Sequence, residues 1–208
     1  MTHCAYCGNK AQYRDRRRGR NVCLAHARFE VVAAEEHAGA PPLTIRPSTT
    51  GDVAHIVELA LHFWDETTID CFDREYDVAA CPAYVACEGD QVVGVASYAL
   101  EPDSNAVVLV ALQVLPEYQG RGGGWALLDA VGDQAACCGL EQVWVATTND
   151  DLPALALYQR YGFRITEVLP DRVADHHGGA FPGLSNIPVR DEIRLIYEGC
   201  PPGWRKEK

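Results

Sequence analysis

The sequence has no long apolar run: none of its apolar stretches approaches the ~20 residues that a membrane-spanning helix requires. The first residues, Met1 to Cys4, lack the charged and then apolar pattern of a signal peptide. We also find no internal repeat and no low-complexity tract. These absences predict a cytoplasmic protein that does not enter a membrane.

Positive charge is scarce, because 18 Lys and Arg face 29 Asp and Glu and leave a formal charge of −11. This balance argues against nucleic-acid binding by the chain as a whole. The charge is unevenly spread, with seven basic and four acidic residues up to position 42, and eleven and twenty-five after it. This asymmetry indicates two parts, and a chain of 208 residues is long enough for one domain with a small appendage.

The nine cysteines are an odd number, which does not suit a disulfide framework. Five of them lie inside apolar segments, where free cysteines usually behave as small buried hydrophobic residues in a reducing compartment. These five are Cys71, Cys81, Cys87, Cys137 and Cys138.

The N-terminal cysteines have the spacing of a metal site. Cys4 and Cys7 form one pair, and Cys23 and His26 form a second pair fifteen residues later. Two such pairs can converge on one tetrahedral zinc ion, and four protein ligands leave no open position for catalysis. We therefore predict a structural zinc-binding module over residues 1–36. Unrelated cysteines in a loose terminus are the alternative.

A basic segment, Arg14 to Arg20, lies between the two ligand pairs and follows Tyr13. Such a segment suits contact with phosphate, RNA or an acidic protein, which leaves nucleic acid open as a partner at this one place. A solvated hairpin turn at Gly19 is the simpler interpretation. Residues 37–42, rich in Ala, Gly and Pro, are predicted to be a linker.

The rest of the chain predicts one domain over residues 43–198, followed by a short tail at 199–208. Helices and strands alternate in a mixed order, which indicates an α/β or α+β sheet flanked by helices. An irregular acidic region is expected at 65–77 and a loop at 171–186. Strands are predicted at 43–47, 83–87, 92–98, 106–115, 142–146, 163–168 and 187–197, and helices at 53–64, 125–138 and 152–161.

A glycine-rich turn, Gln119 to Gly124, joins the strand at 106–115 to the helix at 125–138. Glycines let the backbone approach a ligand, and the free N–H groups of a helix start favour phosphate. A P-loop would need Gly-Lys-Ser/Thr, which is absent, and a dinucleotide fingerprint would follow the first strand rather than a hairpin. A purely structural turn stays open as an explanation.

Two segments resemble the motifs of the GNAT acetyltransferases. Leu112 to Gly124 is similar to the family's acetyl-coenzyme A signature, Q/R-x-x-G-x-G/A after a strand, and Leu157 to Phe163 is similar to its second motif, LYxxxGF. The order of strands and helices from Leu43 to Tyr197 fits as well. The resemblance implies the GNAT fold, acetyl-coenzyme A as cosubstrate, and transfer of an acetyl group to an amine.

Carried over by position, the resemblance implies a coenzyme site. The backbone around Leu112 and Val114, at a splayed strand edge, would hydrogen-bond the pantetheine arm like an added strand. Gln119 would begin the loop that holds the pyrophosphate through backbone N–H groups, which are those of Gly120, Arg121, Gly122, Gly123 and Gly124.

Tyr158 matches the family's usual general acid, which would protonate the departing thiolate; a phenol is protonated at neutral pH. Two features depart from the family pattern. The Asn often found seven residues before the tyrosine is here Asp151, and Asn149 is the alternative. The strand at 106–115 contains no acid, although many relatives use a glutamate there as general base.

The acceptor and its base stay open at this point. The acidic charge of the main domain favours a cationic acceptor, such as a small primary amine, a polyamine or a lysine side chain. A homodimer and a non-catalytic acyl-coenzyme A sensor are further alternatives. His176 and His177 could line the acceptor pocket or lie in a surface loop, and the candidate bases are Asp65, Glu66, Asp191 and Glu192.

Overall fold

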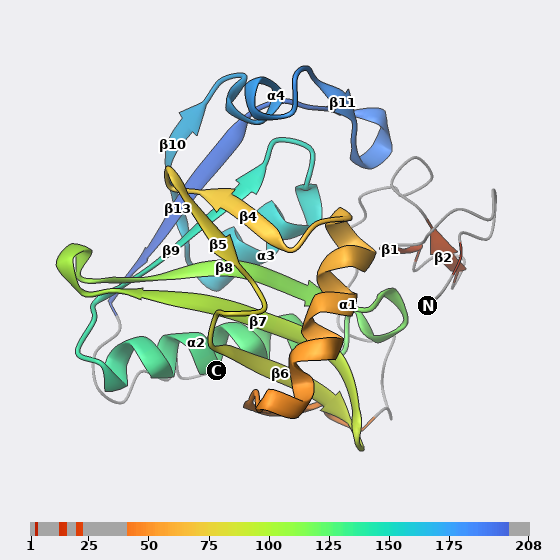
Figure 1. Ribbon diagram of the computed structural model, residues 1–208, viewed down its shortest axis with the longest axis vertical. Coiled ribbons are helices and arrows are strands. Elements are labelled where there is room, and N and C mark those ends of the chain that lie inside the picture. Colours follow the sequence, from red (N-terminus) through yellow and green to blue (C-terminus); the bar gives the residue numbers. More distant parts are fainter. Residues whose placement is uncertain (1–2, 4–12, 16–19, 23–40, 200–208) are drawn as a thin grey trace.

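The computed structural model describes residues 3, 13–15, 20–22 and 41–199. Within these residues a seven-stranded sheet carries helices on both faces (Figure 1), which confirms the predicted mixed sheet flanked by helices. Neighbouring strands of the sheet are antiparallel except β8 and β9, which are parallel. The order is β10 (Arg164–Leu169), β13 (Glu192–Glu198), β9 (Gln142–Thr148), β8 (Ala106–Val114), β7 (Gln91–Glu101), β6 (Ala83–Glu88) and β3 (Thr44–Pro47).

The predicted zinc ligands Cys4, Cys7, Cys23 and His26 lie outside the described residues. Among the residues that the structure does describe, no group of three His, Cys, Asp or Glu side chains could hold a metal ion. In the same N-terminal part, β1 (Tyr13–Asp15) and β2 (Arg20–Val22) pair as antiparallel strands.

The helices divide between the two faces of the sheet. Helix α1 (Val53–Trp64) covers one face, which we call the α1 face, while α2 (Gly123–Cys137) and α3 (Leu152–Tyr161) cover the other. Each helix buries an apolar stripe against the sheet, as its 3.6-residue periodicity predicts. No helix in the described part of the chain is long and apolar enough to cross a membrane.

Polar side chains fix the start of α1. The carboxylate of Asp52 accepts hydrogen bonds from the backbone N–H and the hydroxyl of Thr49, at 2.7 and 2.8 Å, as in a capping box. Arg46 on β3 donates two further bonds to the same carboxylate. This pairing holds the pKa of Asp52 well below its usual range and ties α1 to the sheet.

Two segments predicted to be irregular contain regular structure. In 65–77, β4 (Thr68–Cys71) and β5 (Arg74–Asp77) form a hairpin, and its turn residues Phe72 and Asp73 both have positive φ. The sequence does not reveal this turn because it contains none of the Asn-Gly or Asp-Gly pairs that favour such a conformation. The hairpin forms because it packs on the α1 face, where Cys71 is buried.

The second such segment is the excursion between β10 and β13. The loop predicted at 171–186 contains helix α4 (Arg172–His176) and strand β11 (Phe181–Pro182). The predicted strand at 187–197 is interrupted, with β12 (Pro188–Val189) pairing with β11 before β13 begins. The elements of this excursion are too short for sequence periodicity to detect.

The prediction for the five cysteines is only partly correct. Cys71 and Cys87 are buried, but Cys81 is only half-buried, and Cys137 and Cys138 are exposed. Cys137 and Cys138 lie at the C-terminal end of α2, which is exposed to solvent. Their apolar neighbours in sequence therefore do not enclose them.

Candidate active site

Strands β8 and β9 run parallel only over their first four residues. The last residues that pair between the two strands are Leu109 and Val145. Beyond them β8 continues to Val114 and β9 continues to Thr148 without pairing to each other. The register between β8 and β7 shifts at the same place, since Ala111 lies opposite Ser97 while Leu109 lies opposite Tyr98. The extra residue bends β8 away from β9, as a β-bulge does.

The bulge leaves one edge of β8 directed away from β7. The N–H of Leu115 donates to Val93 on β7 at 2.8 Å. Because the peptide groups of successive strand residues point to opposite sides, those of Leu112 and Val114 point toward the gap between β8 and β9. The two residues predicted to bind the pantetheine arm therefore present backbone groups at an open strand edge, which an extended amide chain can extend as an added strand.

The glycine turn follows this edge. Gly120 and Gly122 have φ angles of 83° and 81°, a conformation that side chains disfavour. Helix α2 begins at Gly123, and its first bond runs from the N–H of Ala126 to the carbonyl of Gly122 at 2.9 Å. The N–H groups of Gly123, Gly124 and Trp125 lack intrahelical partners at such a start and suit an anionic ligand. The N–H group of Trp125 was not among the predicted groups, because its position in the first helical turn depends on where α2 begins.

The side chains of Gln119 and Arg121 stabilise the glycine turn. Gln119 donates from Nε2 to the carbonyl of Val114 at 2.9 Å. Arg121 reaches Glu88, with an N–O distance of 2.7 Å, and donates to the carbonyl of Pro41 at 2.8 Å. The guanidinium of Arg121 lowers the pKa of the Glu88 carboxyl. The side chain of Arg121 therefore braces the turn against β6.

Tyr158 lies next to the start of α2. An added Cβ at Gly124 would be 3.4 Å from Leu157, the residue before Tyr158 on α3. Tyr158 is buried in the same apolar cluster on which Leu112 and Val114 pack, and its ring lies 5.5 Å from that of Phe163. The structure thus brings the glycine turn, the open strand edge and the predicted general acid together.

Burial keeps Tyr158 protonated. Desolvation raises the pKa of its phenol far above the usual value, and the charge of Asp151 raises it further. The phenol therefore carries its proton at neutral pH, which is the state that a general acid requires. It cannot serve as a base there.

Asp151 and Asn149 have different positions in the turn between β9 and α3. Asp151 caps α3 by accepting the N–H of Ala154 at 3.1 Å, and burial raises its pKa to about 6. Asn149 accepts the N–H groups of Arg190 and Asp191 and donates to the carbonyl of Pro188. The amide of Asn149 therefore ties β9 to the turn before β13.

The neighbouring Asp150 is buried and holds the β10–β13 excursion against β9. It accepts the N–H of Leu184 at 2.7 Å and the hydroxyl of Thr148 at 2.5 Å. An added Cβ at Gly183 would be 2.2 Å from this carboxylate. A glycine is therefore needed where the excursion contacts the active-site turn.

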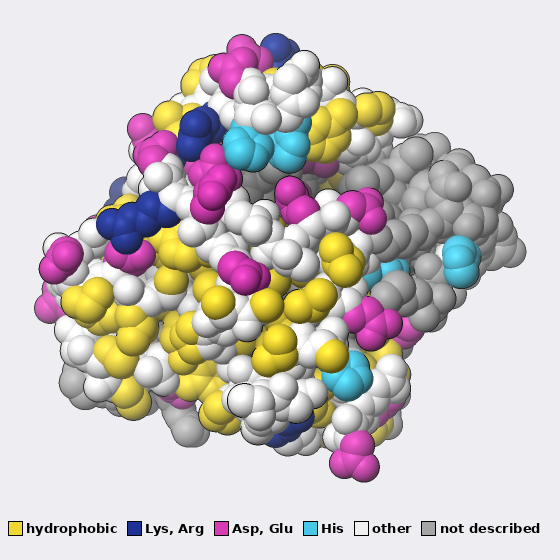
Figure 2. All heavy atoms as spheres, in the orientation of Figure 1, with side chains coloured by type: hydrophobic (Ala, Val, Ile, Leu, Met, Phe, Trp, Pro, Cys, Tyr) yellow, Lys and Arg dark blue, Asp and Glu magenta, His cyan; other side chains and the backbone are white. Residues whose placement is uncertain are grey.

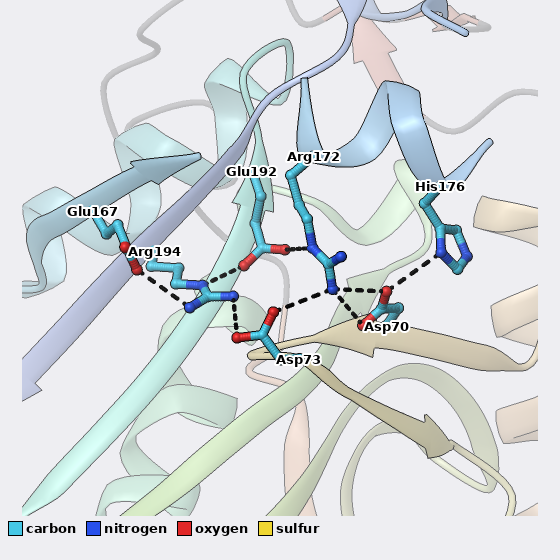
Figure 3. A network of polar contacts seen from close by, with 7 residues as sticks. All are labelled: Asp70, Asp73, Glu167, Arg172, His176, Glu192 and Arg194. Atoms are coloured by element: carbon cyan, nitrogen blue, oxygen red, sulfur yellow. Dashed lines mark hydrogen bonds and ion pairs between the residues drawn. The ribbon is translucent and has the colours of Figure 1, made fainter. Parts of the chain in front are cut away.

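A network of charged side chains lies on the α1 face, between the β4–β5 hairpin and α4 (Figure 3). Arg172 contacts Asp70 at 3.2 Å, Asp73 at 3.3 Å and Glu192 at 4.0 Å. Arg194 contacts Asp73 at 3.2 Å and the buried Glu192 at 2.5 Å. This network joins three segments that are distant in sequence.

The network is acidic overall. Its members are four carboxylates, two arginines and one imidazole, and they are Asp70, Asp73, Glu167, Glu192, Arg172, Arg194 and His176. Figure 2 shows His side chains gathered with Asp and Glu side chains beneath the segment that contains α4 and β11. This excess of negative charge favours a cation approaching the α1 face.

The four candidate bases have different surroundings in the structure. Both oxygens of Glu192 face arginines, and Asp191 accepts the N–H of Asp171 at 2.8 Å. Asp65 and Glu66 are exposed just beyond α1. None of these four is brought to the open edge of β8 by an observed contact, so the base stays unassigned.

His176 lies in a short helix and contacts the charged network. It belongs to α4, and its Nδ1 lies 3.4 Å from Asp70 (Figure 3). His177 contacts the rings of His176 and Phe181 instead. The ring of His176 is therefore directed at Asp70, within the charged network on the α1 face.

An open strand edge, a helix start and a buried tyrosine together suit an extended, phosphate-bearing thioester lying along β8. The model of the acetyltransferase (GNAT) family matches residues 44–163, which is more than half of the chain. The chain belongs to the GNAT acetyltransferase family and is an acetyltransferase.

Individual relatives agree with this assignment. The L-amino acid N-acyltransferase MnaT of Escherichia coli (strain K12) is 27% identical over 143 residues, which cover 62% of this chain and 83% of MnaT. An IAA acetyltransferase from Bacillus cereus ATCC 14579 superposes with a TM-score of 0.60 at 28% identity, over 75% of this chain and 99% of that one. A GNAT acetyltransferase from Elizabethkingia anophelis with acetyl-CoA bound shares the fold, with a TM-score of 0.59 and 22% identity over 76% and 99% of the two chains.

Proposed function

We propose that this acetyltransferase transfers the acetyl group of acetyl-coenzyme A directly to a primary amine. The observation that carries the proposal is the divergence of β8 from β9 beside the start of α2 and Tyr158. The open edge suits the amides of the pantetheine arm, and the helix start suits the pyrophosphate. A relative named as an N-acyltransferase supports an amine as acceptor.

The reaction follows from these positions. The neutral amine attacks the thioester carbon, and the negative charge that develops on the carbonyl oxygen is stabilised by backbone N–H groups at the edge of β8. The C–S bond then breaks, and Tyr158 donates its proton to the thiolate. The attacking nitrogen loses one proton to solvent, and solvent returns one to Tyr158. No covalent enzyme intermediate is required.

The matched test is Tyr158→Phe against Tyr161→Phe. Tyr161 lies on the same helix and is equally buried, but its hydroxyl donates to Asp129 at 2.9 Å, away from β8. Loss of a general acid lowers kcat by about 10²–10⁴-fold. With thiol release measured against a panel of primary amines, we expect this loss in Tyr158→Phe only, with binding of acetyl-coenzyme A unchanged.

A protein that senses acyl-coenzyme A without turning it over would behave differently. It would bind acetyl-coenzyme A, release no thiol with any amine, and respond equally to the two tyrosine substitutions. That result would contradict the proposed reaction.

From spacing alone we propose a structural zinc ion held by Cys4, Cys7, Cys23 and His26. Thiolate and imidazole donors favour zinc, and a module this short needs the metal to fold. Native mass spectrometry should show one zinc per chain. The double variant Cys4→Ser/Cys23→Ser should contain none, and zinc retained in that variant would refute the ligand set.

A further inference from the structure

The chain enters the main domain against the glycine turn. Arg121 of the turn donates to the carbonyl of Pro41 at 2.8 Å. An added Cβ at Gly123 would be 2.8 Å from the side chain of Leu43, so the absence of a side chain there lets the entering segment pack closely. The residues that precede the main domain are therefore attached at the place where we put the phosphates of the coenzyme.

The hairpin of β1 and β2 lies beside the same turn. Cα atoms of β1 come within 8 Å of Cα atoms of the 3-10 helix η5 (Pro116–Tyr118), which directly precedes the glycine turn. Figure 1 shows the two short strands next to this part of the chain. Two observations, the entering segment and this contact, thus place the hairpin at the coenzyme end of the site.

The hairpin has a basic sequence. Residues 13–22 contain five arginines and one aspartate. Two of these arginines belong to the described strands, where Arg14 lies opposite Asn21 and Arg20 lies opposite Asp15. The hairpin therefore brings an excess of positive charge to the glycine turn.

The main domain has few cations to offer to an anionic ligand. Positions 41–199 contain no lysine and eight arginines. The arginine of the glycine turn itself is already paired with Glu88. Six of the eight arginines pair with a carboxylate of the domain, and they are Arg46, Arg74, Arg121, Arg172, Arg190 and Arg194. An acidic domain of this kind repels phosphate groups unless positive charge is added nearby.

The coenzyme has one more phosphate group than the glycine turn accounts for. In the proposed function the pantetheine arm lies along β8 and the pyrophosphate lies at the start of α2. The adenosine and its 3′-phosphate follow the pyrophosphate, so they extend past the turn and away from β8. A phosphate monoester carries about −1.5 to −2 charges at neutral pH. The backbone N–H groups of the turn are occupied by the pyrophosphate, so the 3′-phosphate needs another partner.

We propose that the hairpin of β1 and β2 binds the 3′-phosphate of acetyl-coenzyme A through the charge of Arg14 and Arg20; this inference rests on the proposed function. A guanidinium group and a phosphate form charge-assisted hydrogen bonds, which are stronger than those between neutral groups. The hairpin therefore makes the enzyme selective for coenzyme A over its 3′-dephospho form. The basic N-terminal segment thereby has a part in coenzyme binding.

The test measures the dissociation constants of acetyl-coenzyme A and of acetyl-3′-dephospho-coenzyme A for the full chain. Arg14→Gln/Arg20→Gln removes two charges from the hairpin, and the control Arg164→Gln/Arg190→Gln removes two exposed charges from β10 and from the turn before β13. Wild type and control should bind acetyl-coenzyme A about tenfold more tightly than the dephospho ligand, as one charge-assisted hydrogen bond provides. The hairpin variant should bind the two ligands alike.

The dephospho ligand separates a lost phosphate contact from a damaged protein. Its affinity should be the same in wild type and in Arg14→Gln/Arg20→Gln, and Arg14→Lys/Arg20→Lys, which keeps the charge, should keep most of the preference. A hairpin variant that retains the tenfold preference, or that loses affinity for both ligands equally, would overturn the inference. A wild-type protein that binds both ligands alike would overturn it too. If the wild-type protein binds neither ligand, the proposed function fails instead.

Discussion

The proposed coenzyme side of this sheet and its α1 face, where we place the acceptor side, are built in different ways. On the coenzyme side, one continuous segment, 112–124, supplies the open strand edge, the glycine turn and the helix start, mostly through backbone groups. On the acceptor side, apolar side chains come from α1, β7 and β8, and charged side chains come from β4, α4 and β13. The first site is local in sequence and the second depends on the tertiary fold.

This difference separates what the family shares from what belongs to this chain. Backbone groups can bind the same coenzyme with many sequences, provided that glycines permit the turn. Side chains from distant segments set the charge and width of the acceptor site, and these can change without disturbing the coenzyme. Substitutions on the two sides should therefore affect different substrates, and the predictions below test that separation.

The largest effect, on the affinity for acetyl-coenzyme A, is expected at Gly122. Gly122 and Gly139 both have positive φ angles, 81° and 72°, and an added Cβ meets nothing at either position. Gly122→Val and Gly139→Val should cost similar stability, because the strain is the same. Only Gly122→Val should displace the helix-start N–H groups and weaken acetyl-coenzyme A binding, by about a hundredfold if two charge-assisted hydrogen bonds are lost. Calorimetric titration would check this, and equal affinities in the two variants would contradict the assigned coenzyme site.

The next effect concerns stability at Asp151. Burial raises its pKa from 3.8 to about 6, so the folded protein binds the proton more tightly than the unfolded chain does. This residue therefore stabilises the fold below pH 3.8, and its contribution is lost as the pH rises to about 6.

Asp151→Asn keeps the cap of α3 and removes the charge. It should raise the free energy of unfolding at pH 7 by on the order of 2 kcal/mol and change it little at pH 3.5 or so. Urea unfolding at both pH values measures this. A variant that is less stable at pH 7 would show that the carboxylate is stabilised by contacts that the structure does not contain.

The smallest effect, on the KM of the amine, is expected from Arg172 in the charged network. Arg172→Met removes the two ion pairs of Arg172 with the β4–β5 hairpin, while Arg190→Met breaks an exposed pair with Asp171 in the same excursion. Exposed ion pairs contribute about 1 kcal/mol or less, so both variants should fold. Arg172→Met alone should change the amine KM, by about threefold, because it alters the charge facing the acceptor. An altered KM for acetyl-coenzyme A instead would break the separation of the two sides.

Most of the coenzyme side could be predicted from the sequence. The strand, turn and helix from 106 to 137 are contiguous, and their β-branched run, glycines and helical periodicity are local signals. Tyr158 was found because its motif is equally local. The splayed edge of β8 around Leu112 and Val114 was expected only from the resemblance to the family, since the bulge at this place appears only when β7 and β8 are paired.

The acceptor side could not be predicted in the same way. The β4–β5 hairpin has strands of four residues and a turn of Phe72 and Asp73, which no propensity favours. The arginine partners of the candidate base Glu192 come from positions 172 and 194, which sequence patterns do not connect to it.

The central claim is that a single bound acetyl-coenzyme A gives its acetyl group directly to an amine. A single-turnover experiment with enzyme in excess, followed by rapid quench and mass spectrometry, tests it most directly. The account predicts that coenzyme A and the acetylated amine appear together, one for one, without an acetylated protein. Release of coenzyme A before the acetylated amine, with the acetyl group on the protein, would contradict it.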